Sequence, residues 1–277
     1  MISYQHTLWN SQKAVQESEP SSNILTPQEA IGNICVKRDD LFEVAGVRGG
    51  KARTCWHLAQ NSTGLVTASS RHSPQANIVA HIAQELGISC HIHTSCGELF
   101  PELLSARKCG AEIIQHKPGY NSVIIARARE DAIKNGFTNI PFGMECWEAI
   151  NQTSKQARNL ILGIRRIVIP VGSGMSLAGV LWGLKDSYRQ IPVTGIVVGA
   201  DPTKRLNKYA PSDWQTITTL IKSPFKYHES APRELTHWRL QNLDPIYEAK
   251  CVPFLQPGDL FWIVGIRESA IKKEVGL

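Results

Sequence analysis

The chain has 277 residues, of which 42% are hydrophobic and 19% are charged, proportions typical of a folded globular protein. Lysine and arginine number 30 against 24 acidic residues, and this scattered surplus permits a nucleic-acid partner without arguing for one. No apolar run reaches the ~18–20 residues that a membrane-spanning helix needs. The N-terminus does not resemble a secretion signal, and seven cysteines, an odd number, favour reduced thiols, so we expect a cytoplasmic protein without a membrane partner.

Short apolar runs alternate with helical periodicity from about residue 64 onward. In residues 73–87, for example, Ile78, Val79 and Ile82 lie on one face of a helix. The alternation predicts an α/β fold, with parallel sheets covered by helices on both faces. The Pro-rich stretch 201–250 has no clear period. The expected strands are 64–69, 88–93, 111–116, 193–200 and 258–266; the expected helices are 73–87, 98–110, 121–136 and a stretch within 145–162; residues 165–184 form a strand, a loop and a helix.

Two glycines place a lysine at the start of an expected helix. In the segment EVAGVRGGKARTCWHL, Gly49 and Gly50 precede Lys51. A surface lysine needs no such setting, whereas a lysine that must reach a ligand, or bond to it covalently, can use one. Lys51 is therefore a candidate site residue if the rest of the chain supplies a partner for it.

A glycine-rich loop joins a buried strand to a helix in VIPVGSGMSLAGVLWG. Its loop residues are Gly172, Ser173, Gly174 and Ser176. Glycines let backbone N–H groups converge on an anion, and the helix dipole adds favourable potential there. The loop lacks the ending of a nucleoside-triphosphate loop and the spacing of the dinucleotide fingerprint. It is either a phosphate-binding loop or a tight turn without a ligand.

A second helix start follows the strand expected at 64–69. Ser73 is a good N-cap and Pro74 suits the first helical position. The free N–H groups of this helix point toward the carboxyl end of the strand, where open α/β sheets bind ligands. A carboxylate could dock there, although capping alone also accounts for the pattern.

The segment SCHIHTSC brings Cys90, His91, His93 and Cys96 close together in sequence. On a strand the two histidines share one face while Cys90 takes the other, so the four side chains do not converge. We therefore expect no metal site.

These pieces together resemble the tryptophan-synthase-β-like superfamily of pyridoxal-phosphate enzymes, called fold type II, and within it the branch of 1-aminocyclopropane-1-carboxylate deaminase and D-cysteine desulfhydrase. VKRDDLFEVAGVRGGKART (36–54) is similar to that branch's Lys-Arg-Glu-Asp-Leu stretch and its Gly-Gly-Asn-Lys, here without the Asn. SSRHSPQ (69–75) occupies the place of the family's Ser-Asn-x-Thr-Arg-Gln, and GSGMSLAG (172–179) that of its phosphate loop. LDPIYEAK (243–250) resembles the deaminase's Asp-Pro-Val-Tyr-Glu-Gly-Lys, where desulfhydrases carry Thr in place of Glu248.

The resemblance implies pyridoxal 5′-phosphate as the cofactor and Lys51 as its Schiff-base lysine. It places Glu248 opposite the pyridine nitrogen and Tyr247 against the substrate, and Lys51, once freed, becomes the general base at Cα. The implied catalytic residues are Lys51, Tyr247 and Glu248; the implied cofactor-binding residues are Lys51, Arg71, Gly172, Ser173, Gly174, Met175, Ser176 and Glu248; the implied substrate-binding residues are Ser70, His72, Ser73 and Gln75.

The resemblance also implies a two-domain architecture and a homodimer. Residues 1–54 and 144–277 are expected to form a larger cofactor-binding domain, and residues 55–143 a smaller α/β domain. The cofactor is expected in the cleft between them, at the carboxyl ends of strands.

We therefore expect a pyridoxal-phosphate-dependent lyase or deaminase that acts on a small amino acid through a Lys51 aldimine and a carbanion at Cα. A β-replacement synthase of the same fold is an alternative, against which Glu248 argues. A non-catalytic binding or accessory protein is another, because Arg71 replaces the family's Asn and the chain is shorter than is usual. A sugar-phosphate or nucleotide binder that uses only the glycine loop is a further alternative.

Overall fold

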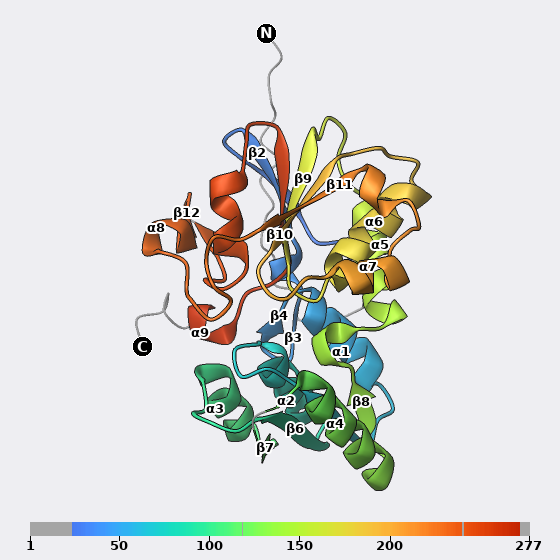
Figure 1. The fold of residues 1–277 in the computed structure, drawn as a ribbon, viewed down its shortest axis with the longest axis vertical. Coiled ribbons are helices and arrows are strands. Elements are labelled where there is room, and N and C mark those ends of the chain that lie inside the picture. Colours follow the sequence, from blue (N-terminus) through green and yellow to red (C-terminus); the bar gives the residue numbers. More distant parts are fainter. Residues whose placement is uncertain (1–23, 118, 240, 272–277) are drawn as a thin grey trace, which may run out of the picture.

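Two separate sheets form the framework of the computed structural model, which describes residues 24–117, 119–239 and 241–271 (Figure 1). The larger sheet is parallel except at one edge, where β1 pairs antiparallel with β2, and the smaller sheet is parallel throughout. The expected α/β class is therefore confirmed. In spatial order the larger sheet contains β1 (Gln28–Ile31), β2 (Ile34–Arg38), β14 (Asp259–Ile263), β9 (Arg166–Val171), β10 (Val193–Val197) and β11 (Thr218–Lys222), and the smaller sheet contains β7 (Glu112–His116), β6 (Ser89–Ser95), β5 (Gly64–Ala68) and β8 (Thr138–Ile140).

Helices pack around both sheets (Figure 1). None of the helices in the described part of the chain is both long enough and apolar enough to cross a bilayer. The α-helices are α1 (Gly50–Ala59), α2 (Gln75–Glu85), α3 (Pro101–Lys108), α4 (Asn121–Asn135), α5 (Trp147–Arg158), α6 (Met175–Asp186), α7 (Thr203–Tyr209), α8 (Arg233–Thr236) and α9 (Glu268–Ile271). The short 3₁₀ helices are η1 (Asp39–Leu41), η2 (Phe142–Met144), η3 (Trp214–Thr216) and η4 (Glu248–Phe254), and two small ribbons pair β3 (Glu43–Val44) with β4 (Val47–Arg48) and β12 (His237–Trp238) with β13 (Gln241–Asn242).

Several elements differ from the sequence-based expectation. The strands β1, β2, β8 and β11 were not expected. Strand β2 carries Lys37 in its interior, and this side chain is only 1% exposed because its Nζ donates to Thr26 O (2.6 Å) and to Gln156 Oε1 (2.9 Å). Helix α2 begins at Gln75 rather than at residue 73 or 74, since Ser73 Oγ accepts the Gln75 N–H (3.2 Å) from just outside the helix.

Helices α5 and α6 pack closely against each other because α6 presents two glycines one turn apart. A Cβ atom on Gly179 would lie 2.5 Å from Thr153 Cβ, and one on Gly183 would lie 2.5 Å from Ala157 Cβ. Larger residues would therefore separate the helices. This packing fixes α6, whose first turn borders the candidate site.

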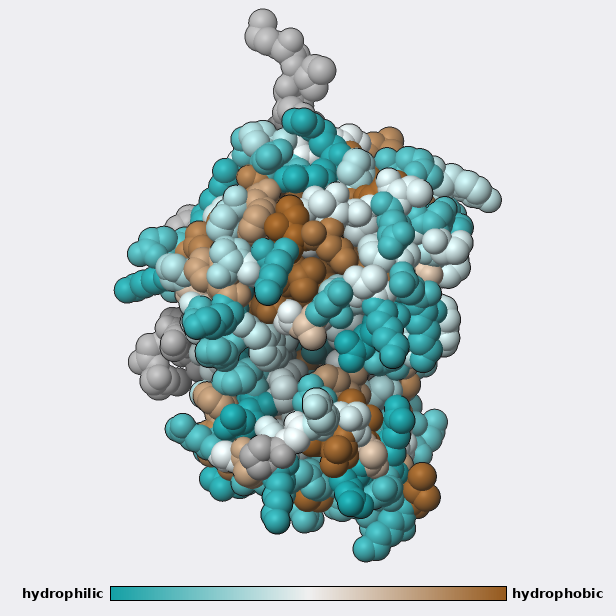
Figure 2. All heavy atoms as spheres, viewed as in Figure 1, coloured by the Kyte–Doolittle hydropathy of each residue, from teal (hydrophilic) through white to brown (hydrophobic). Residues whose placement is uncertain are grey.

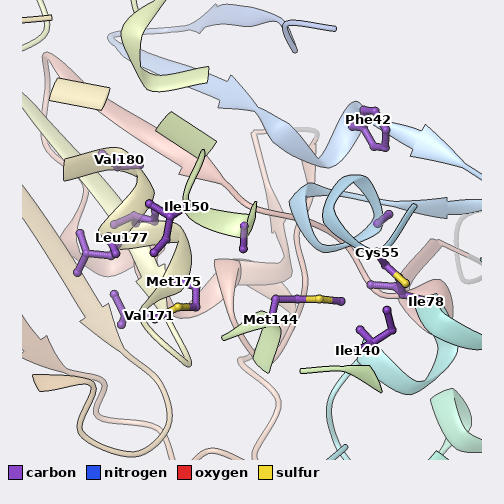
Figure 3. Close-up of a cluster of buried hydrophobic side chains, with 14 of the residues drawn as sticks. Phe42, Cys55, Ile78, Ile140, Met144, Ile150, Val171, Met175, Leu177 and Val180 are labelled. Atoms are coloured by element: carbon purple, nitrogen blue, oxygen red, sulfur yellow. The ribbon is translucent and has the colours of Figure 1, made fainter. Parts of the chain in front are cut away.

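One hydrophobic cluster extends through both parts of the molecule. In Figure 3, Met144 lies between side chains of the larger part, such as Val171 and Met175, and side chains of the smaller part, such as Cys55 and Ile140. Met144 is 2% exposed. The two sheets are thus joined by a continuous apolar core as well as by the backbone.

The strands of the smaller sheet all fall within residues 55–143, and those of the larger sheet fall outside this range. Because the core is shared, the division into separate domains at these residues stays a prediction. Residues 1–23 and 272–277, which were assigned to the larger domain, lie outside the described residues.

Candidate active site

Strands from both sheets end at one cavity. Ser69 follows β5, Gly172 follows β9, Gly199 lies just beyond β10 and Val264 follows β14, and all four residues line a cavity of about 350 Å³. Figure 2 shows this face of the molecule hollowed between the upper and lower parts, with hydrophilic side chains on both sides. The carboxyl ends of parallel strands are where open α/β sheets bind ligands. A cavity shared by two such sheets is therefore the candidate active site.

Lys51 lies at the start of α1 and lines the cavity. Burial lowers the pKa of its amine from 10.5 to about 8, because the charged form is poorly solvated there. The carboxylates of Asp244 and Glu248 oppose this shift, and the Arg267 charge adds to it. The amine is therefore partly neutral, and hence nucleophilic, near physiological pH.

The glycines before Lys51 have a structural cause. Gly49 has a φ of +100°, and a Cβ atom there would lie 2.7 Å from both Gly265 Cα and Val264 O. The Gly50 N–H donates to Val264 O (2.9 Å). The glycines thus let the start of α1 pack directly against the end of β14. Backbone packing at this position requires Gly49, whether or not the lysine moves.

The glycine-rich loop lies between β9 and α6, with Gly172, Ser173, Gly174 and Ser176 in the cavity lining. Gly174 has a φ of +93°, a backbone angle that residues with a side chain rarely adopt, and α6 begins at the next residue. Ser173 Oγ donates to Gly143 O (2.8 Å), so this hydrogen bond links the loop to η2. The backbone N–H groups at this end of the cavity are available to an anion.

Met175 is the exception within this loop. Its side chain is 2% exposed and belongs to the hydrophobic core rather than to the cavity lining. A contact of Met175 with a cofactor is therefore restricted to its backbone N–H at the start of α6.

Ser70, Ser73 and Gln75 line the cavity at the N-terminus of α2. Ser70 Oγ lies 3.2 Å from the hydroxyl of Tyr227. The side-chain amide of Gln75 donates to Thr67 Oγ1 (2.9 Å) and to the carbonyl oxygen of Pro141 (2.8 Å). Gln75 thus joins α2 to β5 and the end of β8, which fixes the helix start on the floor of the cavity.

Arg71 and His72 lie outside the cavity lining, which differs from the expectation for both. The Arg71 guanidinium lies 5.5 Å from the centre of the Phe100 ring, and the His72 ring lies 4.2 Å from it. Contacts of this kind with an aromatic ring are favourable for both side chains. Burial, followed by the Arg71 charge, lowers the pKa of His72. The roles assigned to Arg71 toward the cofactor and to His72 toward the substrate therefore stay predictions.

Tyr247 and Glu248 line the cavity at the start of η4. The Tyr247 hydroxyl lies 2.9 Å from that of Tyr227, and Glu248 Oε1 accepts the N–H groups of Val264 and Gly265, both at 3.2 Å. Glu248 is 2% exposed. Burial raises the pKa of Glu248 well above its ordinary value, and the nearby Asp244 carboxylate adds to this effect. Burial therefore disfavours the charged form of Glu248.

Sequence reasoning missed the site residue Tyr227 and also Lys250, which supports Tyr227 from outside the cavity lining. Tyr227 lines the cavity, and its hydroxyl connects Ser70 to Tyr247. Lys250 is completely buried, and its Nζ donates to the carbonyls of Lys226 (2.8 Å) and Tyr227 (3.4 Å). Tyr227 lies in the stretch without a clear period, so no local pattern signals it. Lys250 ends the LDPIYEAK motif, which was its one available signal.

The histidines of SCHIHTSC form a hydrogen-bonded cluster away from the cavity. His91 Nδ1 and His93 Nε2 lie 2.7 and 3.0 Å from Asp131 Oδ2, and His93 Nδ1 lies 2.8 Å from His116 Nε2. Cys90 is on the other, buried face of β6. Within the part of the chain that the structure describes, no group of three or more His, Cys, Asp or Glu side chains is arranged to hold a metal ion.

The cavity residues fit pyridoxal 5′-phosphate. A glycine at φ +93° and a helix N-terminus suit the phosphate, and Gly172 leaves room that a Cβ atom, 3.0 Å from the Tyr247 ring, would fill. An amine with a pKa of about 8 suits the aldehyde, and the Glu248 carboxyl group in the same cavity lining suits the ring nitrogen. The donor set is thus complete for phosphate, aldehyde and ring.

Comparison with known proteins agrees with this geometry. A family model described as "Pyridoxal-phosphate dependent enzyme" matches residues 21–240. A Thermotoga maritima protein provisionally named as a 1-aminocyclopropane-1-carboxylate deaminase is 28% identical over 185 residues, which span 60% of this chain and 58% of that protein. The chain thus matches little more than half the length of this relative.

Solved structures share the fold. An ACC deaminase homologue superposes with a TM-score of 0.74 at 21% identity, covering 87% of this chain and 89% of that one. A diaminopropionate ammonia lyase from Escherichia coli gives 0.65 at 13% identity (94% and 87% covered), and a threonine deaminase from Solanum lycopersicum gives 0.61 at 16% (91% and 83%). The chain belongs to the pyridoxal-phosphate dependent enzyme family, in its fold type II group, and its cofactor is pyridoxal 5′-phosphate.

Proposed function

We propose that the protein is a lyase or deaminase that releases ammonia from a small amino acid. The observation that carries the proposal is the convergence of Lys51, Tyr247 and Glu248 on one cavity, opposite the glycine-rich loop and the α2 N-terminus. The provisional name of the Thermotoga maritima relative, a 1-aminocyclopropane-1-carboxylate deaminase, supports deamination.

Different parts of the cavity lining divide the binding task. The Gly172–Ser176 loop would hold the cofactor's phosphate through backbone N–H groups, and Lys51 would hold the cofactor covalently. The α2 N-terminus, with Ser70 and Ser73, would receive the carboxylate of the amino acid through hydrogen bonds that favour a negative charge.

Proton movement is assigned to four side chains. When bound, the cofactor withdraws electrons from the amino acid's Cα and so acidifies its proton. The Lys51 amine, with a pKa of about 8, can accept and return that proton. The Glu248 carboxyl group would hold a proton at the ring nitrogen. The hydroxyls of Tyr227 and Tyr247, 2.9 Å apart, can pass a proton to the leaving group.

The test is to supply the purified protein with the cofactor and a panel of small amino acids, and to measure ammonia and oxoacid. Lys51→Ala should abolish release, and Glu248→Gln should slow it by about 100-fold, or ~2.7 kcal/mol on the barrier, with cofactor affinity retained. Lys185→Ala, which removes an exposed lysine paired with Asp213 at 3.2 Å, is the control and should behave as the wild type. Turnover that requires an added thiol and survives Glu248→Gln would instead identify a β-replacement synthase.

A second candidate is a protein that binds the cofactor without turnover. One observation favours it, which is that Arg71, in the place of the family's Asn, lies over Phe100 and outside the cavity lining. Incubation in deuterium oxide distinguishes the two candidates. Exchange of the α-proton of any amino acid in the panel supports the enzyme, and its absence for every amino acid supports the binding protein.

A further inference from the structure

Arg267 lies just beyond β14 and is buried, with 7% of its surface exposed. Its Nε donates to Asp244 Oδ2 (2.8 Å) and one terminal nitrogen to Asp244 Oδ1 (3.2 Å). The other terminal nitrogen donates to His72 O (3.4 Å) and lies 3.6 Å from Glu102 Oε1 in α3. A single guanidinium therefore contacts three segments that are far apart in sequence.

Two of these segments present the candidate site residues. Asp244 Oδ1 also accepts the backbone N–H groups of Ile246 (2.8 Å) and Tyr247 (3.1 Å). Asp244 thus fixes the turn that places Tyr247 and Glu248 in the cavity. The His72 carbonyl belongs to the loop that places Ser70 and its neighbours at the opposite wall.

The third segment is α3, a helix that contacts β7 of the smaller sheet. Glu102, which is 3% exposed, accepts the Ser269 hydroxyl (2.6 Å) as well as facing the guanidinium. A second bond joins the Ser105 hydroxyl of α3 to the carboxylate of Glu268. The two residues directly after Arg267 are therefore bonded to α3, which also faces the Arg267 guanidinium through Glu102.

The charges require the arginine to stay in place. Asp244 and Glu102 are both buried carboxylates, and Arg267 is the cation that faces both of them. Removing one member of such a buried pair leaves the partner charge without compensation. A guanidinium with two bonds to one carboxylate also fixes the orientation of that carboxylate, which a lysine ammonium group does not. The Asp244 carboxylate, and the turn that it caps, therefore depend on the guanidinium for both charge and direction.

We propose that Arg267 is a positioning residue that couples the two halves of the site, by holding the Tyr247–Glu248 turn and the Ser70–Ser73 loop at a fixed separation. The proposal rests on the proposed function only in taking this cavity as the place where the amino acid reacts. Arg267 itself is outside the cavity lining, so its effect on the reaction passes through Asp244 and His72.

The first test measures hydrogen–deuterium exchange on the cofactor-free protein by mass spectrometry. Arg267→Gln should speed exchange at least tenfold in peptides that cover both 69–76 and 243–250. The matched control is Arg166→Gln, which breaks another bidentate pair, to Asp259 at 3.0 and 2.6 Å, away from the cavity. It should leave both peptides unchanged. Unchanged exchange in Arg267→Gln, or equal acceleration in the control, would overturn the proposal.

A second variant guards against a general loss of folding. Glu102→Gln keeps the pair between Arg267 and Asp244 but weakens the contact with α3, so it should speed exchange in 69–76 and leave 243–250 protected. Acceleration of both peptides to the same extent would contradict the separate contacts that the proposal requires. Neither exchange measurement needs turnover, so this proposal and the proposed function can fail independently.

The third test uses the cofactor-loaded protein and a turned-over amino acid. Arg267→Gln should leave cofactor affinity within threefold, raise KM and lower kcat at least tenfold. Arg267→Lys keeps the charge without the bidentate contact. Relative to Arg267→Gln, it should therefore restore thermal stability more fully than it restores kcat. Full recovery of kcat by lysine would show that charge alone matters and would overturn the positioning assignment.

Discussion

Gly174 offers a direct test of the phosphate-binding loop. The residue has a φ of +93°, and a Cβ atom there would lie 3.2 Å from Pro202 Cβ and 3.5 Å from a methyl group of Leu206. Alanine at a left-handed position costs about 1–2 kcal/mol. The Pro202 ring has little freedom to move away from the added methyl group, so the loop backbone has to rotate instead. Rotation moves the N–H groups that converge at the α6 N-terminus.

The expected loss of affinity follows from the bonds that would be misaligned. A hydrogen bond to a charged group contributes about 1.5–3 kcal/mol, so losing one from the phosphate should weaken cofactor binding at least tenfold, or ~1.4 kcal/mol. Gly110→Ala is the matched control. Gly110 has a φ of +87°, and nothing lies within 4 Å of the position of a Cβ atom there. It carries the same backbone strain as Gly174→Ala but lies after α3, outside the cavity lining.

The assay titrates cofactor-free protein with pyridoxal 5′-phosphate and, separately, with pyridoxal, which has no phosphate. Gly174→Ala should bind the phosphorylated compound at least tenfold more weakly and bind pyridoxal as the wild type does. Gly110→Ala should lose similar stability in urea and keep both affinities. If Gly174→Ala loses affinity for both compounds equally, or for neither, the loop is only a turn and the phosphate lies elsewhere.

Two further predictions concern the lysines. Because the pKa of Lys51 is about 8, the rate of cofactor attachment should rise about tenfold per pH unit below pH 8 and level off above it. Stopped-flow absorbance measures this rate, and a rise that continues toward pH 10 would mean that Lys51 is an ordinary, solvated amine. Lys250→Met removes the donor to the carbonyls of Lys226 and Tyr227, so it should lower the free energy of unfolding by about 1–3 kcal/mol and raise the substrate KM, with cofactor affinity unchanged. Unchanged KM in that variant would show that Tyr227 does not need this support.

The parts of the fold that could be predicted are those written in local patterns. The strands β5, β6, β7, β9, β10 and β14 are short buried apolar runs, and the helices between them show a helical period, so their types and order follow from the sequence. The glycine loop also follows, because only a few backbone conformations connect a buried strand to a helix so tightly. Lys51 was found because it lies in such a local motif, whereas Glu248 was assigned only through the family resemblance of LDPIYEAK.

The remainder depends on contacts between distant segments. Strand β2 was missed because Lys37 breaks its apolar run, and the bonds that make this lysine tolerable come from residues as far away as Gln156. Tyr227 and Arg267 lie in segments with no clear motif, and their partners are distant in sequence, Ser70 for the first and Asp244 for the second. A single sequence does not show which distant polar groups will meet.

Burial acts in opposite directions on the two groups that the chemistry needs. It lowers the pKa of Lys51 to about 8 and raises that of Glu248 well above its ordinary value, so both approach their neutral forms in the same cavity. A neutral amine can attack an aldehyde, and a carboxyl group can hold a proton at a ring nitrogen, so both residues suit the cofactor. Asp244, which lines this cavity, is paired with Arg267, which does not line it, and Asp244 Oδ1 orients the Tyr247 turn. The turn that presents Tyr247 and Glu248 is thus oriented by an ion pair of which only the Asp244 side reaches the cavity.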